Sequence, residues 1–505
     1  GAQHLNRMYA WLLEFHRRDE KPMWWRYFER LSMEEQALID DLDCLGGLVR
    51  TETPVRPIKR STGYEYRFDP DQDTRLAVEA KCVSSVSPNF KVTSEEIDRE
   101  AGLVEVKIGP GKELPSRLSL IPDEYLSAEV IKQALLRHVK EWRDAGLIHT
   151  AIDDLLLRKP PRFPDRVGGP VIPGTGDLIT ETIAAVRELD GGTLAIQGPP
   201  GTGKTHTAAR VIAALIADGK KVGIVATGHA VINNLLARIA EVAPELAGGP
   251  LWKLGGDQDH PALESGIVNH SGDTKRGAGL AAAGPVAIGG TAWLFSRPEM
   301  ERTLDYLFID EAGQVSLANA VAVGRAARNL VLIGDQMQLA QPTQGLHPGE
   351  SGLSCLEYLL QGHQTIPPEM GIFLGTSYRM HPDVCGFISE GYYEGRLHSA
   401  ESANGNRVIL PAGSGVPRET GVVFLGVDHE GCTQGSDEEV EAVAALVADL
   451  LKAKVTVKGQ PPRRMTLDDI LIVAPFNMQV RALKARLGDR ARIGADLTAG
   501  LRLVW

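Results

Sequence analysis

The sequence predicts an α/β protein that is built around a doubly wound parallel sheet and has a smaller sheet earlier in the chain. An apolar run at residues 194–196 stops at Gln197 and passes through a glycine-rich turn into a helix-like segment at 207–218. Further strand-like runs alternate with helix-like segments, as the crossovers of a parallel sheet require. Residues 46–120 instead alternate apolar and polar side chains, which predicts a small antiparallel sheet or barrel.

The glycine-rich turn has the spacing G-x-x-x-x-G-K-[ST] of a phosphate loop. Its glycines let backbone N–H groups close around phosphates, and the following helix adds its positive N-terminal end. Lys204 is expected to reach the β- and γ-phosphates, and the Thr205 hydroxyl to bind Mg²⁺. The plainer alternative is a turn that only joins a strand to a helix. The loop predicted to hold a nucleoside triphosphate consists of Gly198, Pro199, Pro200, Gly201, Thr202, Gly203, Lys204 and Thr205.

Two carboxylates end a later apolar strand. The run 304–309 is followed by Asp310 and Glu311, which fits the second half of a phosphate-loop site. We expect Asp310 to hold Mg²⁺ together with Thr205, and Glu311 to position and deprotonate an attacking water. An acidic strand end is weak support by itself, and the loop upstream strengthens it.

Two further residues suit the sensing and stabilisation of a γ-phosphate. Gln338 follows the strand-like run 330–333, where an uncharged amide can hydrogen-bond that phosphate. Arg379, in the stretch YRMHP, is a planar charged donor that could stabilise the transferring phosphoryl group from across a cleft. By its chemistry alone, a surface arginine beside a His-Pro turn is the simpler interpretation of Arg379.

Composition narrows the class of protein. The 505 residues are 43% hydrophobic and 24% charged, which is ordinary for a globular chain of several domains. The formal net charge of −11 argues against a uniformly basic coat for nucleic acid but leaves room for a local basic groove. The five cysteines lie far apart without metal-ligand spacing, no apolar run is long enough for a membrane span, and no signal peptide begins the sequence. We therefore expect a cytoplasmic protein without disulfides, structural zinc or a membrane partner.

Four stretches, in this order, resemble the motifs of one enzyme superfamily. GPPGTGKT, IDEAGQ, GDQMQLAQP and SYRMHP are similar to superfamily 1 helicases of the branch that includes the RNA-surveillance (nonsense-mediated decay) helicases. This resemblance covers about residues 165–490. The stretch EFHRRDEKPMWWRYF near the N-terminus resembles more closely the helicase half of bacterial fusions with an upstream RecB-like nuclease domain, and no such domain is present in these 505 residues.

The resemblance implies two RecA-like motor domains with ATP and Mg²⁺ between them, moving along single-stranded DNA or RNA, 5′ to 3′ in this branch. It places Lys204 and Asp310 on one wall of the ATP site and Arg379 on the other, with Tyr378 stacked on the adenine. We expect a monomer. The predicted division is an N-terminal helical segment (1–45), an accessory β-barrel (46–120), stalk helices and a linker (121–164), a first motor domain (165–350) and a second motor domain (351–505).

The resemblance also assigns residues to the nucleic-acid strand. Hydroxyls, amides and exposed backbone N–H groups hold phosphates without reading bases. For Thr227 and Thr291, turn formation and helix capping are the simpler roles without this family context. Between them, residues 248–284 lack a clear period, and we expect an inserted, mobile segment there. The residues predicted to contact the strand are Thr227, Gly228, His229, Asn233, Gly290, Thr291, Pro475 and Phe476.

Two departures from the family pattern bear on function. The glutamine that usually reads adenine shortly before the loop has no counterpart near residues 171–177. The sequence stops at Trp505, before later motifs of the second motor domain, so we expect that domain to be incomplete. Two other functions stay open: a nucleic-acid clamp that binds ATP without cycling, and a P-loop switch or small-molecule kinase. The choice between DNA and RNA also stays open.

Overall fold

The computed structural model describes residues 1–72, 74–87, 89–123, 125–146, 150–166, 168–338, 343–457, 460–488, 490–495 and 502–504. The chain divides into two compact units. The smaller consists of residues 2–144 and 342–352, and the larger of Gly1, residues 145–341 and residues 353–505. Each unit is described by itself below.

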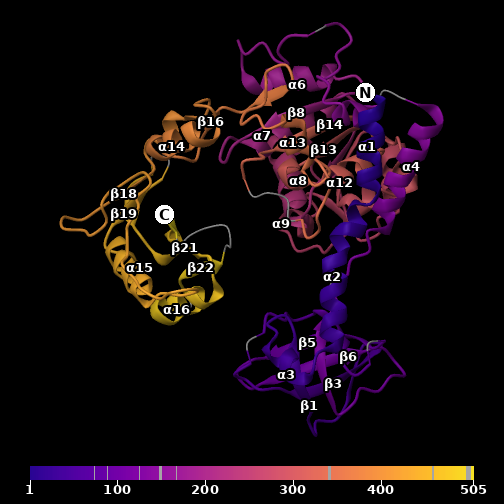
Figure 1. The fold of residues 1–505 in the computed structure, drawn as a ribbon. Coiled ribbons are helices and arrows are strands. Elements are labelled where there is room, and N and C mark those ends of the chain that lie inside the picture. The colour runs from indigo at the N-terminus through magenta and orange to yellow at the C-terminus, as the bar shows by residue number, and fades with distance from the viewer. Residues whose placement is uncertain are drawn as a thin grey trace. The chain divides into compact units, whose positions relative to one another are not determined.

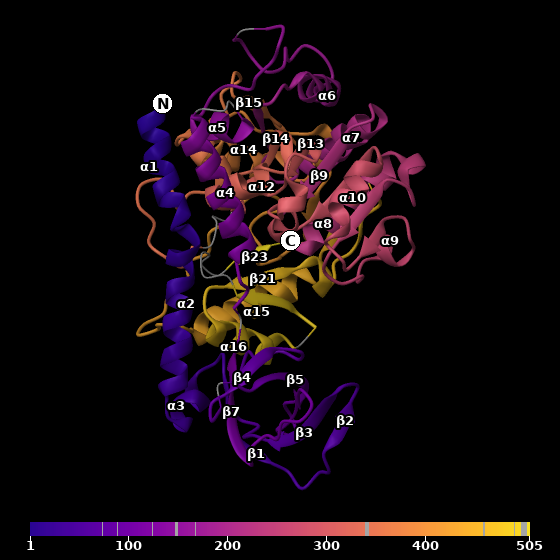
Figure 2. The same ribbon diagram turned by 90° about the vertical axis from the view of Figure 1, so that its right-hand side faces the viewer.

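The smaller unit contains an antiparallel sheet with its own apolar core (Figure 2). Alternate side chains of β6 are buried, as the period-two pattern predicts, and Tyr66, Val106 and Leu120 are fully buried. β1 pairs with both β7 and β3, so the strand order β1-β7-β4-β5-β6-β3 returns to its start, as a small barrel requires. The strands are β1 (Leu45–Arg50), β2 (Arg56–Ile58), β3 (Ser61–Arg67), β4 (Lys81–Ser84), β5 (Lys91–Asp98), β6 (Leu103–Ile108) and β7 (Arg117–Pro122).

Helices flank this sheet in the sequence. Apolar residues recur at helical spacing on the first helix, which buries Leu5, Met8 and Leu12. Its Tyr9 hydroxyl lies 2.9 Å from the His138 Nε2 atom of the fourth helix, so the two helices are joined by a buried polar contact as well as by packing. The helices are α1 (Ala2–Leu13), α2 (Phe15–Ser32), α3 (Glu35–Asp40) and α4 (Glu129–Ala145).

The larger unit is organised by a parallel sheet (Figure 1). Within the described residues its order is β11-β10-β12-β9-β13-β14-β8-β15, and every pairing in it is parallel. All five residues of β8 are buried, because helices cover both faces of such a sheet. The strands are β8 (Thr193–Gln197), β9 (Lys221–Val225), β10 (Leu251–Leu254), β11 (Asn269–Ser271), β12 (Val286–Gly290), β13 (Leu304–Ile309), β14 (Ala327–Gly334) and β15 (Gly371–Phe373).

Helices alternate with these strands, which confirms the predicted α/β fold. The two helices on either side of β9 pack on the sheet through a shared core that includes Ile212, Leu215 and Leu236. The helices of this part are α5 (Ala151–Leu156), α6 (Leu178–Glu188), α7 (Lys204–Ala217), α8 (His229–Val242), α9 (Pro261–Glu264), α10 (Arg276–Ala283), α11 (Ala292–Phe295), α12 (Leu317–Gly324), α13 (Cys355–Leu360) and α14 (Pro382–Tyr392).

Two expectations about this sheet need correction or adjustment. The expectation of an inserted, mobile segment at 248–284 is wrong, since β10 and β11 lie inside it and extend the main sheet. These strands are too short to show a period in the sequence. The sheet also continues past the predicted boundary at residue 351, because β15 pairs in parallel with β8.

The later part of the chain has its own apolar core, with Val440, Val447, Ile472 and Leu483 among its members. Its strands form three small sheets: β16 with β17, β18 with β19 and β20, and β21 with β22 and β23. The last of these is mixed, since β21 pairs in parallel with β22 and antiparallel with β23. The elements of this part of the chain are β16 (Thr376–Ser377), β17 (His398–Ser399), β18 (Arg407–Ile409), α15 (Asp437–Leu450), β19 (Lys454–Thr456), β20 (Arg463–Arg464), β21 (Leu471–Ala474), α16 (Asn477–Leu487), β22 (Arg492–Ala495) and β23 (Arg502–Val504). Trp505 lies outside the described residues.

None of the five cysteines forms a disulfide, and four of them are buried: Cys44, Cys82, Cys355 and Cys385. The fifth, Cys432, is partly exposed. A search of the described residues finds no helix with the length and apolarity needed to cross a membrane.

The pairing of β15 with β8 can be tested at Gly371. A Cβ atom there would lie 2.3 Å from the Ala195 carbonyl oxygen, so Gly371→Ala should lower the free energy of unfolding by about 1–3 kcal/mol in chemical denaturation. Gly386→Ala, inside α14 with open space around the glycine, is the control and should be neutral or slightly stabilising. Equal stability of the two variants would contradict the pairing.

Candidate nucleotide-binding site

The phosphate loop lies at the carboxyl end of β8 and leads directly into α7. Gly201 and Gly203 have positive φ angles of 76° and 82°, which a residue with a Cβ atom adopts at a cost. Gly203 is the N-cap of α7, and no side chain caps the first turn. The backbone N–H groups of that turn are therefore available to an anion, as the sequence predicts.

Lys204 begins α7 and folds back over the loop. Its Nζ atom donates to the Gly198 carbonyl oxygen at 2.7 Å, while the Thr202 hydroxyl donates to the Pro199 carbonyl oxygen at 2.8 Å. Thr205 is exposed beside Lys204. The ammonium group is thus held at the mouth of the loop by a neutral acceptor, which a phosphate oxygen can replace.

Asp310 and Glu311 follow β13, at the same edge of the sheet. The Asp310 side chain is only 5% exposed, and its Oδ1 atom accepts a hydrogen bond from the Glu311 backbone N–H at 2.9 Å. Burial, and then the charge of Glu311, raise the pKa of Asp310 to about 6, while the backbone N–H and the nearby Lys204 oppose this. Glu311 has a φ of 51°, an uncommon conformation for a residue with a side chain and one that recurs at functional sites.

Gln338 follows β14, the strand between β13 and β8. Its Nε2 atom donates to the Asp335 Oδ2 atom at 3.0 Å. Sequence reasoning selected Gln338 and passed over Asp335, although both belong to the same GDQMQL stretch. Leu339 at the end of that stretch lies outside the described residues.

Tyr378 and Arg379 lie directly against the phosphate loop. The Tyr378 backbone N–H donates to the Gly201 carbonyl oxygen at 2.9 Å, and the Ser377 hydroxyl donates to the Pro200 carbonyl oxygen at 3.1 Å. A Cβ atom on Gly201 would lie 2.4 Å from the Arg379 Cβ atom. The Tyr378 ring is 53% exposed and so accessible to a base. The expectation that Arg379 lies across a cleft from the loop is therefore not met. The Arg379 backbone lies beside the loop, because β15, which precedes it, pairs with β8 in the same sheet.

The strand-contact candidates of this sheet lie at the same edge, on β9 and β12. These strands are neighbours, with Val225 opposite Gly290. Thr227 is exposed at the end of β9, and Gly228 is the N-cap of α8 without a side-chain cap. Thr291 is likewise the N-cap of α11, and its hydroxyl makes no capping hydrogen bond.

His229 is held by a residue that sequence reasoning missed. Lys253 of β10 is completely buried, and its Nζ atom contacts the His229 Nδ1 atom at 2.8 Å and the Gly255 carbonyl oxygen at 2.5 Å. Because an ammonium group only donates, His229 accepts at Nδ1 and carries its proton on Nε2. Burial, and then Lys253, lower the pKa of His229, so this ring is a neutral donor at pH 7. A lysine inside an apolar run (LWKLG) was the available signal.

The remaining candidates lie elsewhere. Asn233 of α8 is only 3% exposed, and its Oδ1 atom has no hydrogen-bond partner. A contact between Asn233 and a nucleic-acid strand would need this side chain to leave its position. Pro475 follows β21 in a separate three-stranded sheet, and Phe476, the N-cap of α16, is 39% exposed.

These residues fit ATP and Mg²⁺. The uncapped first turn of α7 and the Lys204 ammonium suit phosphate oxygens, and the Thr205 hydroxyl and Asp310 carboxylate are the hard oxygen ligands that Mg²⁺ prefers. Among the described residues no three His, Cys, Asp or Glu side chains gather as a metal site. Magnesium here would therefore use these two side chains together with water and phosphate oxygens.

Two family models match the chain. Both are described as AAA domain; one matches residues 180–347 and the other residues 352–498.

Curated proteins are similar to part of the chain. The chain is 25% identical over 358 residues to the DNA-binding protein SMUBP-2 of Rattus norvegicus, which covers 58% of this chain and 35% of that protein. It is 24% identical over 377 residues to the DNA polymerase alpha-associated DNA helicase A of Schizosaccharomyces pombe, and this match covers 61% of this chain and 53% of that protein. It is 26% identical over 255 residues to the DNA replication ATP-dependent helicase/nuclease DNA2 of Saccharomyces cerevisiae, and this match covers 48% of this chain and 16% of that protein. The chain thus spans from about a sixth to about half of these relatives.

The buried Lys253 predicts a pH dependence of stability. Burial lowers the pKa of Lys253 from 10.5 to about 8, so between these values the unfolded chain binds more protons than the folded one, and stability rises with pH. The free energy of unfolding of the parent protein should therefore increase relative to that of Lys253→Met from about pH 7 to about pH 9.5. Lys220→Met, at an exposed position, controls for the loss of a lysine. The same pH trend in both variants would contradict this origin.

Proposed function

We propose that this chain is a superfamily 1 helicase, an ATP-driven motor that moves along single-stranded nucleic acid. One observation carries the proposal. The phosphate loop, the Asp310 carboxylate, the Gln338 amide and the proposed strand contacts of β9 and β12 all follow the carboxyl ends of strands in one parallel sheet. Ligands bind at this edge in open α/β sheets.

The chemistry of hydrolysis follows from the residues around the loop. Glu311 orients a water molecule and accepts its proton as the water oxygen bonds to the γ-phosphorus, and the bond from that phosphorus to the bridging oxygen of ADP breaks. Lys204 and Arg379 neutralise the charge that spreads over the phosphate oxygens. Mg²⁺, held by Thr205 and Asp310, would supply further positive charge and align the phosphates.

A backbone hydrogen bond connects the carboxylates that follow β13 with the proposed strand contacts that follow β9. The Asp310 N–H donates to the Val225 carbonyl oxygen at 2.8 Å, and Val225 ends the strand that leads to Thr227 and Gly228. A change at the carboxylates can therefore reach the strand contacts through one hydrogen bond. The proposed nucleotide site and the proposed strand contacts are therefore parts of one continuous sheet, as a motor requires.

The finer assignments are proposals from the motif resemblance and the relatives. We propose DNA as the polymer, because the relatives are named as DNA-binding proteins and DNA helicases. We propose that the chain moves from 5′ to 3′, because its motifs resemble those of the RNA-surveillance branch. A companion RecB-like nuclease, a monomeric state, a cytoplasmic location and the five-part division of the chain stay predictions.

The first test is ATP hydrolysis by this chain with and without single-stranded DNA and single-stranded RNA. We expect strong stimulation by one polymer, and we expect Lys204→Ala to lower turnover by about a hundredfold or more without changing the circular-dichroism spectrum. Full turnover in Lys204→Ala would remove the active site from this loop.

The other outcomes separate the alternatives. Tight strand binding without turnover would identify a clamp that holds ATP but does not cycle. Turnover that neither polymer changes would favour a switch or a small-molecule kinase.

The strand contacts have a separate test. Thr227 and Thr291 offer hydroxyl groups to phosphates at neighbouring strand ends, so Thr227→Val and Thr291→Val should each weaken strand binding several-fold in fluorescence anisotropy. Because these residues follow β9 and β12, and the phosphate loop follows β8, the affinity for an ATP analogue should stay within twofold. Strand binding that both variants leave unchanged would show that the polymer lies elsewhere.

A further inference from the structure

The buried carboxylate of Asp335 connects the γ-phosphate candidate Gln338 to a tyrosine far along the chain. Asp335 is 2% exposed. Its Oδ2 atom accepts from the Gln338 Nε2 atom at 3.0 Å and from the Tyr393 hydroxyl at 2.7 Å, and its Oδ1 atom accepts from the Met337 backbone N–H at 3.2 Å. One carboxylate oxygen thus holds both Gln338 and Tyr393.

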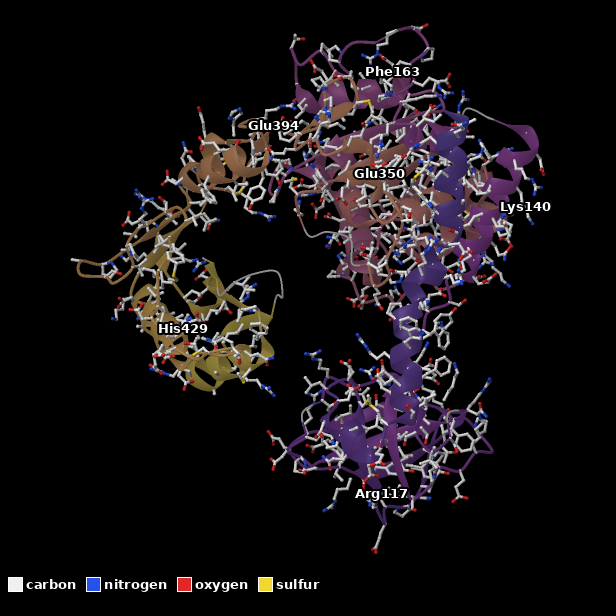
Figure 3. The ribbon with its side chains drawn as sticks, viewed as in Figure 1. Arg117, Lys140, Phe163, Glu350, Glu394 and His429 are labelled. Carbon is white, nitrogen blue, oxygen red and sulfur yellow. The ribbon has the colours of Figure 1, made fainter. Side chains whose placement is uncertain are left out.

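Tyr393 is fixed in place on its own side. It directly follows α14, is 2% exposed, and packs with Cys385 and Leu397, against which Met337 also lies. Burial, and then the charge of Asp335, raise the pKa of the Tyr393 hydroxyl well above its usual range, so it stays a donor. The next residue, Glu394, labelled in Figure 3, accepts a hydrogen bond from the Thr365 hydroxyl at 2.5 Å.

The other end of α14 leads to the arginine beside the phosphate loop. Arg379 is separated from α14 only by Met380 and His381, and His381 caps the helix by accepting the Asp383 backbone N–H. Asp383 in turn accepts the Thr420 hydroxyl at 2.5 Å. The helix therefore extends from the residue that contacts the Asp335 carboxylate to the segment that carries Arg379, and through Asp383 it contacts Thr420.

We propose that Tyr393 is a positioning residue that couples the γ-phosphate sensor Gln338 to α14 and thereby to Arg379. This inference rests on the proposed hydrolysis of ATP at this site. When a γ-phosphate accepts hydrogen bonds from the Gln338 amide, the Asp335 oxygen loses part of that donor and depends more on the Tyr393 hydroxyl. Loss of the phosphate returns the amide to Asp335. The state of the nucleotide is thus converted into a force on one end of α14.

A purely structural role would have a different signature. A hydroxyl that only satisfies a buried carboxylate stabilises the fold whatever Gln338 does, so its removal would add to the effect of removing Gln338. A positioning role through Gln338 makes the two effects overlap, because the second change finds the connection already broken.

The test is a double-mutant cycle of Tyr393→Phe and Gln338→Ala in the whole chain, read as strand-stimulated ATP turnover. We expect Tyr393→Phe to lower kcat by about tenfold while KM for ATP stays within about twofold, since a hydrogen bond to a charged group contributes on this order. The double variant should be no slower than Gln338→Ala alone. Tyr358→Phe is the matched control: Tyr358 is equally buried, and its hydroxyl donates to the Leu156 carbonyl oxygen at 2.6 Å, so turnover should be unchanged.

Three results would overturn the inference. These are additive effects in the cycle, an unchanged kcat in Tyr393→Phe, and an equal loss of kcat in Tyr358→Phe. Failure of the proposed function would look different, because the parent protein itself would then show no strand-stimulated turnover.

Discussion

The parallel register of β9, β13, β14 and β8 is the constraint on which the site depends. It places Gln197 opposite Gly334, Leu332 opposite Ile309, and Ile309 opposite Val225. The chain therefore leaves all four strands at nearly the same level, and the residues that follow them meet without any long-range matching of side chains. The buried apolar strands hold this register, since their side chains pack between helix layers on both faces.

The two buried carboxylates at this edge, Asp335 and Asp310, are stabilised by different surroundings. Asp335 has hydrogen-bond donors on both oxygens, whereas Asp310 has the Glu311 N–H and the nearby charge of Lys204. A pKa of about 6 for Asp310 means that its charge is held at a cost, which a cation beside it would remove. The structure thus separates a carboxylate that organises protein groups from one suited to a metal.

The sequence predicted the parts of this site that depend on local pattern. The loop, the strand that ends at Ile309 and the strand-helix alternation all have signals within a few residues. What it did not predict depends on contacts between distant segments. Nothing near Lys253 indicates that it meets His229, nothing near Tyr393 points to Asp335, and the short strands β10, β11 and β15 take their identity from their neighbours in the sheet.

The distribution of cysteines has a practical consequence. Cys44, Cys82, Cys355 and Cys385 are buried, and burial raises the pKa of the Cys44 and Cys355 thiols to about 12, so they form little of the reactive thiolate. Cys432 stands apart as a partly exposed thiol in the segment before α15. A maleimide dye added to the folded protein would therefore attach mainly at one known place. A fluorescent dye attached at Cys432 would therefore report movements of the later part of the chain in single molecules, without any added cysteine.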